Sequence, residues 1–304
     1  MTIQPNGPSL RTGGQLVVDA LRAHGVDTLF CVPGESYLEV LDALVDAPSI
    51  RVVVCRHEAG AANMAEAYGK LTGRPGICFV TRGPGAAHAA IGCHIARQDS
   101  TPMILFVGQV ERGASDREAF QEVDLRSMFA SLSKWAGQIE DPRRIPELVS
   151  RAFHLAVSGR PGPVVLGLPE DMLVERARAA AVGPYRVVRP SPSGDDMTTL
   201  RAMLEKAQRP FMILGGGGWD DQACVDIRAF AEANVVPVGC AFRRQDLFDN
   251  RHELYAGDVG LGINPALARR VRDADLIIAV GDRLGEATTS GYTLIEPPRP
   301  AQSL

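Results

Sequence analysis

The sequence has no long hydrophobic segment and no excess of one charge. None of its apolar runs approaches the roughly 18 residues that cross a bilayer, and its polar start lacks the apolar region of a secretory signal. The 32 basic and 36 acidic residues leave a net charge of −4, which does not favour a nucleic-acid surface. We therefore expect neither a membrane nor a nucleic acid as partner.

Several signatures of other protein classes are missing. The six cysteines include no Cys-x-x-Cys pair and mostly stand in or beside apolar runs, which predicts reduced core thiols and a cytoplasmic protein. The sequence has no Gly-x-Ser-x-Gly elbow and no Walker A loop. His57-Glu58 lacks the second histidine of a zinc-protease motif.

The pattern of apolar segments predicts an α/β fold. The 304 residues are 45% hydrophobic, enough for two domains with their own cores. The first half predicts strands at 28–32, 51–55, 76–81, 103–107 and 164–168, and helices at 15–24, from 36, and at 58–71, 86–96 and 142–157. We expect Ser36 and Glu39 to form a capping box, and Gly83-Pro84-Gly85 to form a turn. The strands are continuously apolar, which indicates parallel, doubly wound sheets covered on both faces.

Residues 183–198 interrupt this pattern. They are rich in proline, serine and glycine and lack periodicity, which predicts a linker between domains at 1–182 and 199–304. The second domain then predicts helices near 199–207 and 221–233 and strands at 211–214, 235–238 and 275–280. The chain ends in a short proline-rich tail, so we expect the second domain to be cut short at its end.

Glu58 is the first candidate functional residue. It follows a predicted strand and begins a helix, and ligands of open α/β sheets bind at the carboxyl edge of the strands. A carboxylate in a first helical turn also complements the helix dipole. Position alone favours this second, structural role.

A resemblance to a known family favours the functional role of Glu58 over the structural one. The segment RHEAGAANMAEAYGKLTGRPG at 56–76 resembles the thiamine-diphosphate enzymes of the acetolactate synthase and 2-oxo acid decarboxylase group. Further blocks of that family follow its order: VPG at 32–34, T-x-GPG at 81–85, QDSTPMILFVG at 98–108, FQEVD at 120–124, SKW at 133–135, RPGPVVLGLPEDM at 160–172, RPFMILGGGG at 209–218, YAGDVGLG at 255–262 and ADLIIAVGDRLGE at 274–286. The resemblance implies a pyrimidine-binding domain followed by a Rossmann-like central domain.

The resemblance also implies roles for single residues. Thiamine diphosphate reacts as the carbanion of its C2 carbon, and a carboxylic acid bonded to pyrimidine N1′ makes the cofactor's amino group a base for the C2 proton. Glu58 matches that acid. The implied cofactor-binding residues are Pro33, Gly34, Thr81, Gly83, Pro84 and Gly85, and the implied substrate-side residues are Phe120, Gln121 and Lys134. Each of these residues also has a purely structural interpretation. The glycines fit ordinary turns, Phe120 and Gln121 fit the start of a helix, and Lys134 fits a solvated surface lysine.

Three positions depart from the family pattern. Glu35 replaces a frequent glycine, Arg82 the serine before Gly-Pro-Gly, and His88 a frequent asparagine. All three flank the implied pyrimidine pocket, so they bear on the identity of the substrate more than on that of the cofactor.

The segment Gly215–Gly218 lies between a strand and a helix but lacks the third glycine of a dinucleotide fingerprint. Both FAD binding, known in some members, and a tight turn stay open there.

The family binds the cofactor diphosphate and Mg²⁺ on a third domain, marked by Gly-Asp-Gly and a later asparagine. This sequence has no Gly-Asp-Gly, so we expect no Mg²⁺ ligand in this chain and weak thiamine diphosphate binding by the chain alone. The implied function is decarboxylation of a 2-oxo acid such as pyruvate with carboligation, in a homodimer or tetramer. The alternatives are a truncated enzyme, a subunit paired with a separate diphosphate-binding subunit, a non-catalytic partner, and a dinucleotide-dependent oxidoreductase using the Gly215 loop.

Overall fold

The computed structural model describes residues 9–295 and divides into two compact units, Met1–Val188 and Arg189–Leu304. The proline-rich tail at 296–304 lies outside the described residues. Among the residues described, none of the helices is both long enough and apolar enough to cross a membrane.

The first unit is built on a six-stranded parallel sheet, as the continuous apolar strands predict. Its strand order is β3 (Arg51–Val54), β2 (Thr28–Cys31), β4 (Gly76–Val80), β5 (Met103–Gln109), β7 (Pro163–Pro169) and β6 (Trp135–Gln138). A two-stranded antiparallel ribbon adds β1 (Arg11–Thr12) and β8 (Arg176–Ala177). The sequence did not predict β6, whose Trp-Ala-Gly-Gln stretch is too polar to stand out as a buried strand.

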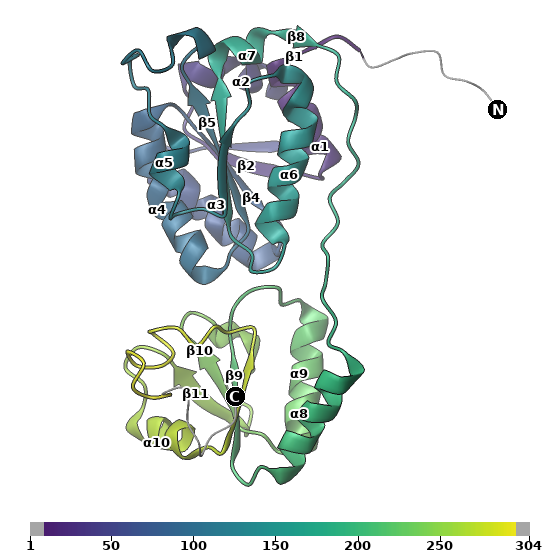
Figure 1. Ribbon diagram of the computed structural model, residues 1–304, viewed down its shortest axis with the longest axis vertical. Coiled ribbons are helices and arrows are strands. Elements are labelled where there is room, and N and C mark those ends of the chain that lie inside the picture. Colours follow the sequence, from purple (N-terminus) through teal and green to yellow (C-terminus); the bar gives the residue numbers. More distant parts are fainter. Residues whose placement is uncertain (1–8, 296–304) are drawn as a thin grey trace, which may run out of the picture. The chain divides into compact units, whose positions relative to one another are not determined.

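Helices cover both faces of this sheet (Figure 1). They are α1 (Gly13–Ala23), α2 (Leu38–Val45), α3 (Glu58–Thr72), α4 (Gly83–Asp99), α5 (Leu125–Phe129), α6 (Ile145–Val157) and α7 (Glu170–Val174), with 3₁₀ turns at Glu35–Tyr37, Arg112–Ala114 and Pro142–Arg144. Side chains along a strand alternate between faces. Ile77 and Phe79 of β4 therefore join the core under α1, α2 and α6, while Cys78 and Val80 join the core under α3, α4 and α5. The doubly wound prediction is confirmed for this unit.

The second unit repeats the architecture on a smaller scale. Its parallel sheet has the order β11 (Tyr255–Val259), β10 (Val238–Ala241), β9 (Pro210–Leu214) and β12 (Leu276–Val280). Its helices are α8 (Gly194–Lys206), α9 (Asp221–Asn234) and α10 (Pro265–Asp273), with a 3₁₀ turn at Gln245–Leu247. Two apolar cores, one on each face of the sheet, again match a doubly wound fold.

Three local expectations differ from the structure. Ser36 and Glu39 form no capping box: Ser36 lies in the 3₁₀ turn and bonds elsewhere, and α2 begins at Leu38 without a side-chain cap. The strand predicted at 235–238 begins only at Val238, because Val235 caps α9 in a left-handed conformation with φ of 51°. Helix α8 begins at Gly194, earlier than predicted, because Ser193 and Asp196 form a capping box there.

Candidate active site

Glu58 lies at the carboxyl edge of the first sheet, where the chain leaves β3 and begins α3. His57 is the N-cap of that helix: its backbone is extended and its Nδ1 atom accepts a hydrogen bond of 3.1 Å from the Ala59 amide. This cap ends the strand and starts the helix at a defined residue. The Glu58 side chain, only 15% exposed, points to α4, where its Oε2 atom lies 3.0 Å from Nδ1 of His88.

Small residues bring α3 and α4 close enough for that contact. A Cβ atom added at Gly92 of α4 would lie 2.5 Å from the Cβ of Ala62 in α3, so no larger residue fits there. Glu58 and His88 each stand one turn earlier in their helix than this contact pair. The rings of His57 and His88 stack with centroids 4.7 Å apart and planes inclined by 30°. Helix packing therefore fixes the distance between the two histidines and the carboxylate.

The ends of β2 and β4 meet beside this group. The Oγ atom of Ser36 lies 2.8 Å from Oγ1 of Thr81, which is the bond that replaces the expected capping box. A Cβ atom at Gly34 would lie 2.6 Å from the Cβ of Thr81, so the chain after Pro33 approaches β4 as closely as only glycine allows. Pro33, Gly34 and Thr81 thus share one edge with Glu58, as the parallel strands require.

Gly83-Pro84-Gly85 forms the first turn of α4 rather than a separate turn. Proline is favoured at the first positions of a helix because its missing N–H has no partner there. The amide of Gly83 donates a 2.9 Å hydrogen bond to the carbonyl of Gln121. A Cβ atom at Gly83 would lie 2.7 Å from that oxygen, so glycine is needed for the approach.

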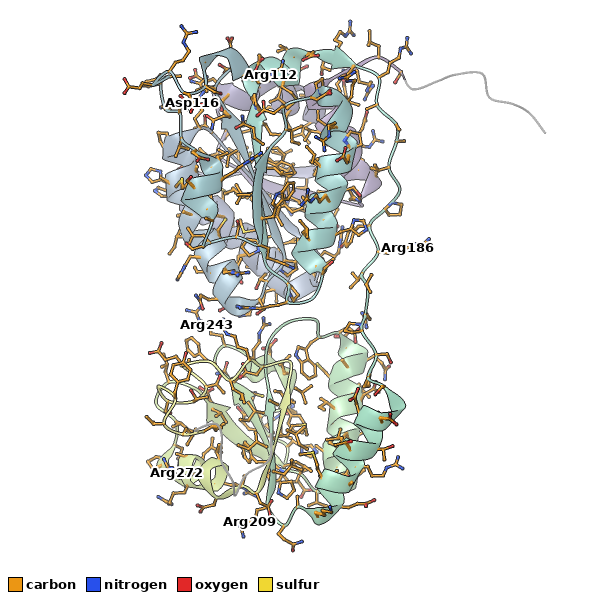
Figure 2. The ribbon with its side chains drawn as sticks, viewed as in Figure 1. Arg112, Asp116, Arg186, Arg209, Arg243 and Arg272 are labelled. Carbon is orange, nitrogen blue, oxygen red and sulfur yellow. The ribbon has the colours of Figure 1, made fainter. Side chains whose placement is uncertain are left out.

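The loop that carries Phe120 and Gln121 is tied down at both ends. At its start, Arg112 pairs with Asp171 at 2.7 Å and Glu175 at 2.8 Å, and Figure 2 shows Arg112 and Asp116 at one end of the first unit. Near its end, the Glu122 carboxylate accepts a 2.8 Å bond from the amide of Asp116. Gln121 adopts a positive φ of 65° and Phe120 is 74% exposed. The structure therefore brings the Gln121 backbone to the start of α4 and leaves the Phe120 ring facing outward.

Glu35 and Arg82, two of the three residues that differ from the family pattern, lie close together. Arg82, which is mostly buried, forms an ion pair of 2.6 Å with Glu170 and lies 3.9 Å from the carboxylate of Glu35. The closer partner of Arg82 is therefore Glu170, and the largely exposed Glu35 lies at the outer side of this pair. The third departure, His88, contacts Glu58 itself.

Lys134, for which the resemblance implied a substrate-side role, does not lie beside this group within the chain. It precedes the parallel strand β6 and therefore lies at the amino edge of the sheet, opposite Glu58. Its ammonium donates to the carbonyls of Leu155 and, at 2.5 Å, Ser158, at the carboxyl end of α6. Burial lowers the pKa of Lys134, and nearby Arg97 and Arg160 add to this effect. Lysine at this point complements the helix dipole, which is neither of the two roles considered from sequence.

The glycine loop of the second unit has a structural explanation. A Cβ atom at Gly216, where φ is 65°, would lie 2.0 Å from the carbonyl of Gly281, so this approach to the end of β12 needs glycine. The following helix α9 is capped by Asp220, whose carboxylate accepts a 2.9 Å bond from the Ala223 amide. A carboxylate in this place opposes a bound phosphate. The geometry therefore supports the tight-turn alternative over a dinucleotide site at this loop.

Comparison with known proteins identifies the family. Residues 11–128 match the model described as "Thiamine pyrophosphate enzyme, N-terminal TPP binding domain", and residues 197–303 match "Thiamine pyrophosphate enzyme, central domain". The chain belongs to the thiamine pyrophosphate enzymes. The first match contains Glu58, His88 and Gln121, and the second contains the whole glycine loop.

Curated relatives of this thiamine pyrophosphate enzyme chain include acetolactate synthases. This chain is 34% identical to the acetolactate synthase large subunit of Parasynechococcus marenigrum over 97% of its own length and 49% of the relative. It is also 34% identical to the acetolactate synthase isozyme 2 large subunit of Escherichia coli, over 94% of this chain and 52% of the relative. The chain thus spans about half the length of the curated relatives it matches.

Sequence reasoning did not find the contact between Glu58 and His88. The two residues are 30 positions apart and belong to different helices. The available signal was the departure itself, because a histidine in place of an asparagine at the edge of the implied pocket introduces a new hydrogen-bonding ring.

Proposed function

We propose that this chain provides the pyrimidine-side part of a thiamine-diphosphate-dependent enzyme that decarboxylates a 2-oxo acid such as pyruvate and joins the product to an acceptor, as acetolactate synthases do. The observation that carries this proposal is the position of Glu58 at the carboxyl edge. Its Oε2 atom pairs with His88, while no hydrogen bond to its Oε1 atom is found within residues 9–295. A partly exposed carboxyl oxygen is therefore free to meet a pyrimidine nitrogen.

In the proposed enzyme each residue of the edge has a physical task. When bound, thiamine diphosphate would supply an acidic C2–H group, whose deprotonated carbon is the nucleophile toward the substrate carbonyl. Glu58 holds a proton at N1′ and exchanges it with the ring, which makes the cofactor's amino group basic. Gly34 and Gly83 keep the backbone close to neighbouring strands and loops, so that side chains do not fill the edge. Phe120 and Gln121 line the substrate side.

The diphosphate and Mg²⁺ have no assigned ligands in this chain. We propose that they bind to a further segment or a separate subunit. We also propose that residues 1–182 form the pyrimidine domain and 199–304 the central domain, with 183–198 as a linker that already includes the start of α8. The family's active sites lie between subunits, so a homodimer or tetramer is proposed. Exposed Met64 of α3 and Ile91 of α4, on the two helices that carry Glu58 and His88, support an interface there.

The Asp220 carboxylate at the start of α9 argues against the oxidoreductase alternative, because it would repel a dinucleotide phosphate. No observation favours FAD at the glycine loop. A non-catalytic or split subunit stays an alternative, and it differs in outcome from an enzyme. Pyruvate turnover by the assembled protein, with acetolactate as product, supports the enzyme. Complete absence of turnover in an assembly that binds thiamine diphosphate favours the non-catalytic partner.

The role of Glu58 is tested by the exchange of the C2 proton of thiamine diphosphate with deuterium, followed by NMR. The measurement uses the chain assembled with the part that binds the diphosphate. We expect Glu58→Gln to abolish the exchange, because an amide cannot transfer the proton. Glu147→Gln is the matched control, since Glu147 is an exposed residue of α6 that pairs with Arg144. Exchange at the wild-type rate in Glu58→Gln would show that the assignment is wrong.

A further inference from the structure

Residues 9–295 bring three metal-ligating side chains together at the start of α3 and α4. His57, Glu58 and His88 each offer a ligand atom, and these atoms all lie within 4.8 Å of one another. The motif His57-Glu58 lacks a second histidine in sequence, and the fold supplies it from the neighbouring helix.

The donor set selects the kind of metal ion. Two imidazoles and one carboxylate are the protein ligands of many three-ligand Zn²⁺ sites, which keep a fourth position for water. Mg²⁺ prefers oxygen ligands and is a poor fit to two nitrogen donors. Bonds of about 2.0–2.1 Å at tetrahedral angles place neighbouring donors roughly 3.3 Å apart. The Nδ1 atom of His88 and Oε2 of Glu58, now 3.0 Å apart, need to separate only slightly to admit such an ion.

The surroundings hold Glu58 and leave both histidines exposed. The Nδ1 atom of His57 accepts a bond from the Ala59 amide, so the neutral ring carries its proton on Nε2, and His57 must give up this bond to bind an ion. The stacking of the two imidazole rings and the close packing of Gly92 on Ala62 limit the movement of both helices. The His88 side chain is 56% exposed, so an ion reaches it from solvent. Glu58 and His88 are therefore preorganised for an ion, whereas His57 exchanges its N-cap bond for the ion.

We propose that His57, Glu58 and His88 form a Zn²⁺ site. The proposal goes beyond the proposed thiamine-dependent function and does not depend on it, because the ion is bound by side chains of this chain alone. The ion takes the same carboxylate that the proposed function gives to the pyrimidine. Zn²⁺ and the pyrimidine then compete for Glu58.

The test is Zn²⁺ binding by the metal-free chain, without an affinity tag, measured by titration calorimetry. Co²⁺ is the spectroscopic probe, because a four-coordinate site gives it strong visible absorption. We expect one ion per chain, and we expect His88→Asn and His57→Asn each to weaken binding by at least about tenfold. Asparagine is a favourable N-cap, so His57→Asn removes the imidazole while helix α3 keeps its cap.

His94→Asn is the matched control, since His94 is an exposed histidine of the same helix α4. It should leave the affinity unchanged, and circular dichroism checks that all variants stay folded. If His57→Asn loses helix content, His88→Asn decides alone, because its ring is half exposed. The proposal is overturned by absence of saturable binding, by binding that persists in His88→Asn, or by an equal loss in His94→Asn.

Discussion

The carboxylate of Glu58 and the imidazole of His88 lie 3.0 Å apart across two helices whose small side chains let them pack closely. The contact joins a residue that matches the family pattern to one that departs from it. Any ligand that needs Glu58 must either share this carboxylate with His88 or displace the histidine. This relationship controls both the proposed cofactor role and the proposed metal site.

If the pyrimidine displaces His88 from Glu58 instead of sharing the carboxylate with it, removing the His88 ring should strengthen thiamine diphosphate binding in the assembled protein. The bond to His88 favours the present orientation of Glu58, and a hydrogen bond of this kind contributes about 0.5–1.5 kcal/mol. We expect His88→Ala to lower the dissociation constant by about twofold to tenfold, measured by calorimetry in buffer that contains Mg²⁺ and no Zn²⁺. His94→Ala should have no effect. Weaker binding in His88→Ala would mean that His88 positions Glu58 for the pyrimidine instead of competing with it.

A side chain at Gly34 should destabilise the first unit. The added Cβ atom would lie 2.6 Å from the Cβ of Thr81, so the ends of β2 and β4 must separate. We expect Gly34→Ala to lower the free energy of unfolding by about 1–3 kcal/mol in urea denaturation. The control is Gly60→Ala in α3, where a Cβ atom meets nothing within 4 Å. That change should leave stability equal or raise it by up to about 1 kcal/mol. Equal stability of both variants would show that the edge is looser than described.

His24 should make stability depend on pH. It is buried against Phe153, its Nδ1 atom accepts a 3.0 Å bond from the Tyr185 amide, and burial, with a contribution from His154, lowers its pKa to about 4. The unfolded chain, with a pKa of 6.5, therefore takes up a proton first as the pH falls. The contribution of His24 to the free energy of unfolding is therefore complete above about pH 6.5. It is lost progressively as the pH falls from about 6.5 to about 4.

The measurement is urea unfolding at about pH 7 and about pH 5, and the expected difference due to His24 is of the order of 2 kcal/mol. His24→Gln should reduce this difference, since glutamine does not titrate and still offers an acceptor to Tyr185. His252→Gln in the second unit is the control. An unchanged pH dependence in His24→Gln would assign the effect to other groups.

Much of the fold was predictable because the relevant signals are local. Continuous apolar runs such as 76–80 and 103–107 are strands buried on both faces, and the helix from Glu58 follows from its alanine-rich pattern. The sequence misled where a local signal was overridden. Ser36 has the spacing of a capping box, but its hydroxyl is buried against Thr81, a residue 45 positions away. Val235 has a high strand propensity, yet it caps a helix because the chain must turn before β10.

In the candidate site too, some features follow from local sequence and others from tertiary packing. The sequence by itself determined that a glutamate begins a helix at the carboxyl edge of a parallel sheet, because strand, cap and helix signals stand within a few residues. Only the tertiary structure decided which side chains surround it. His88 reaches Glu58 because Gly92 packs on Ala62, and Lys134 faces the opposite edge because the strand after it runs parallel to the others. Such contacts depend on the packing of distant segments, which no local pattern in the chain encodes.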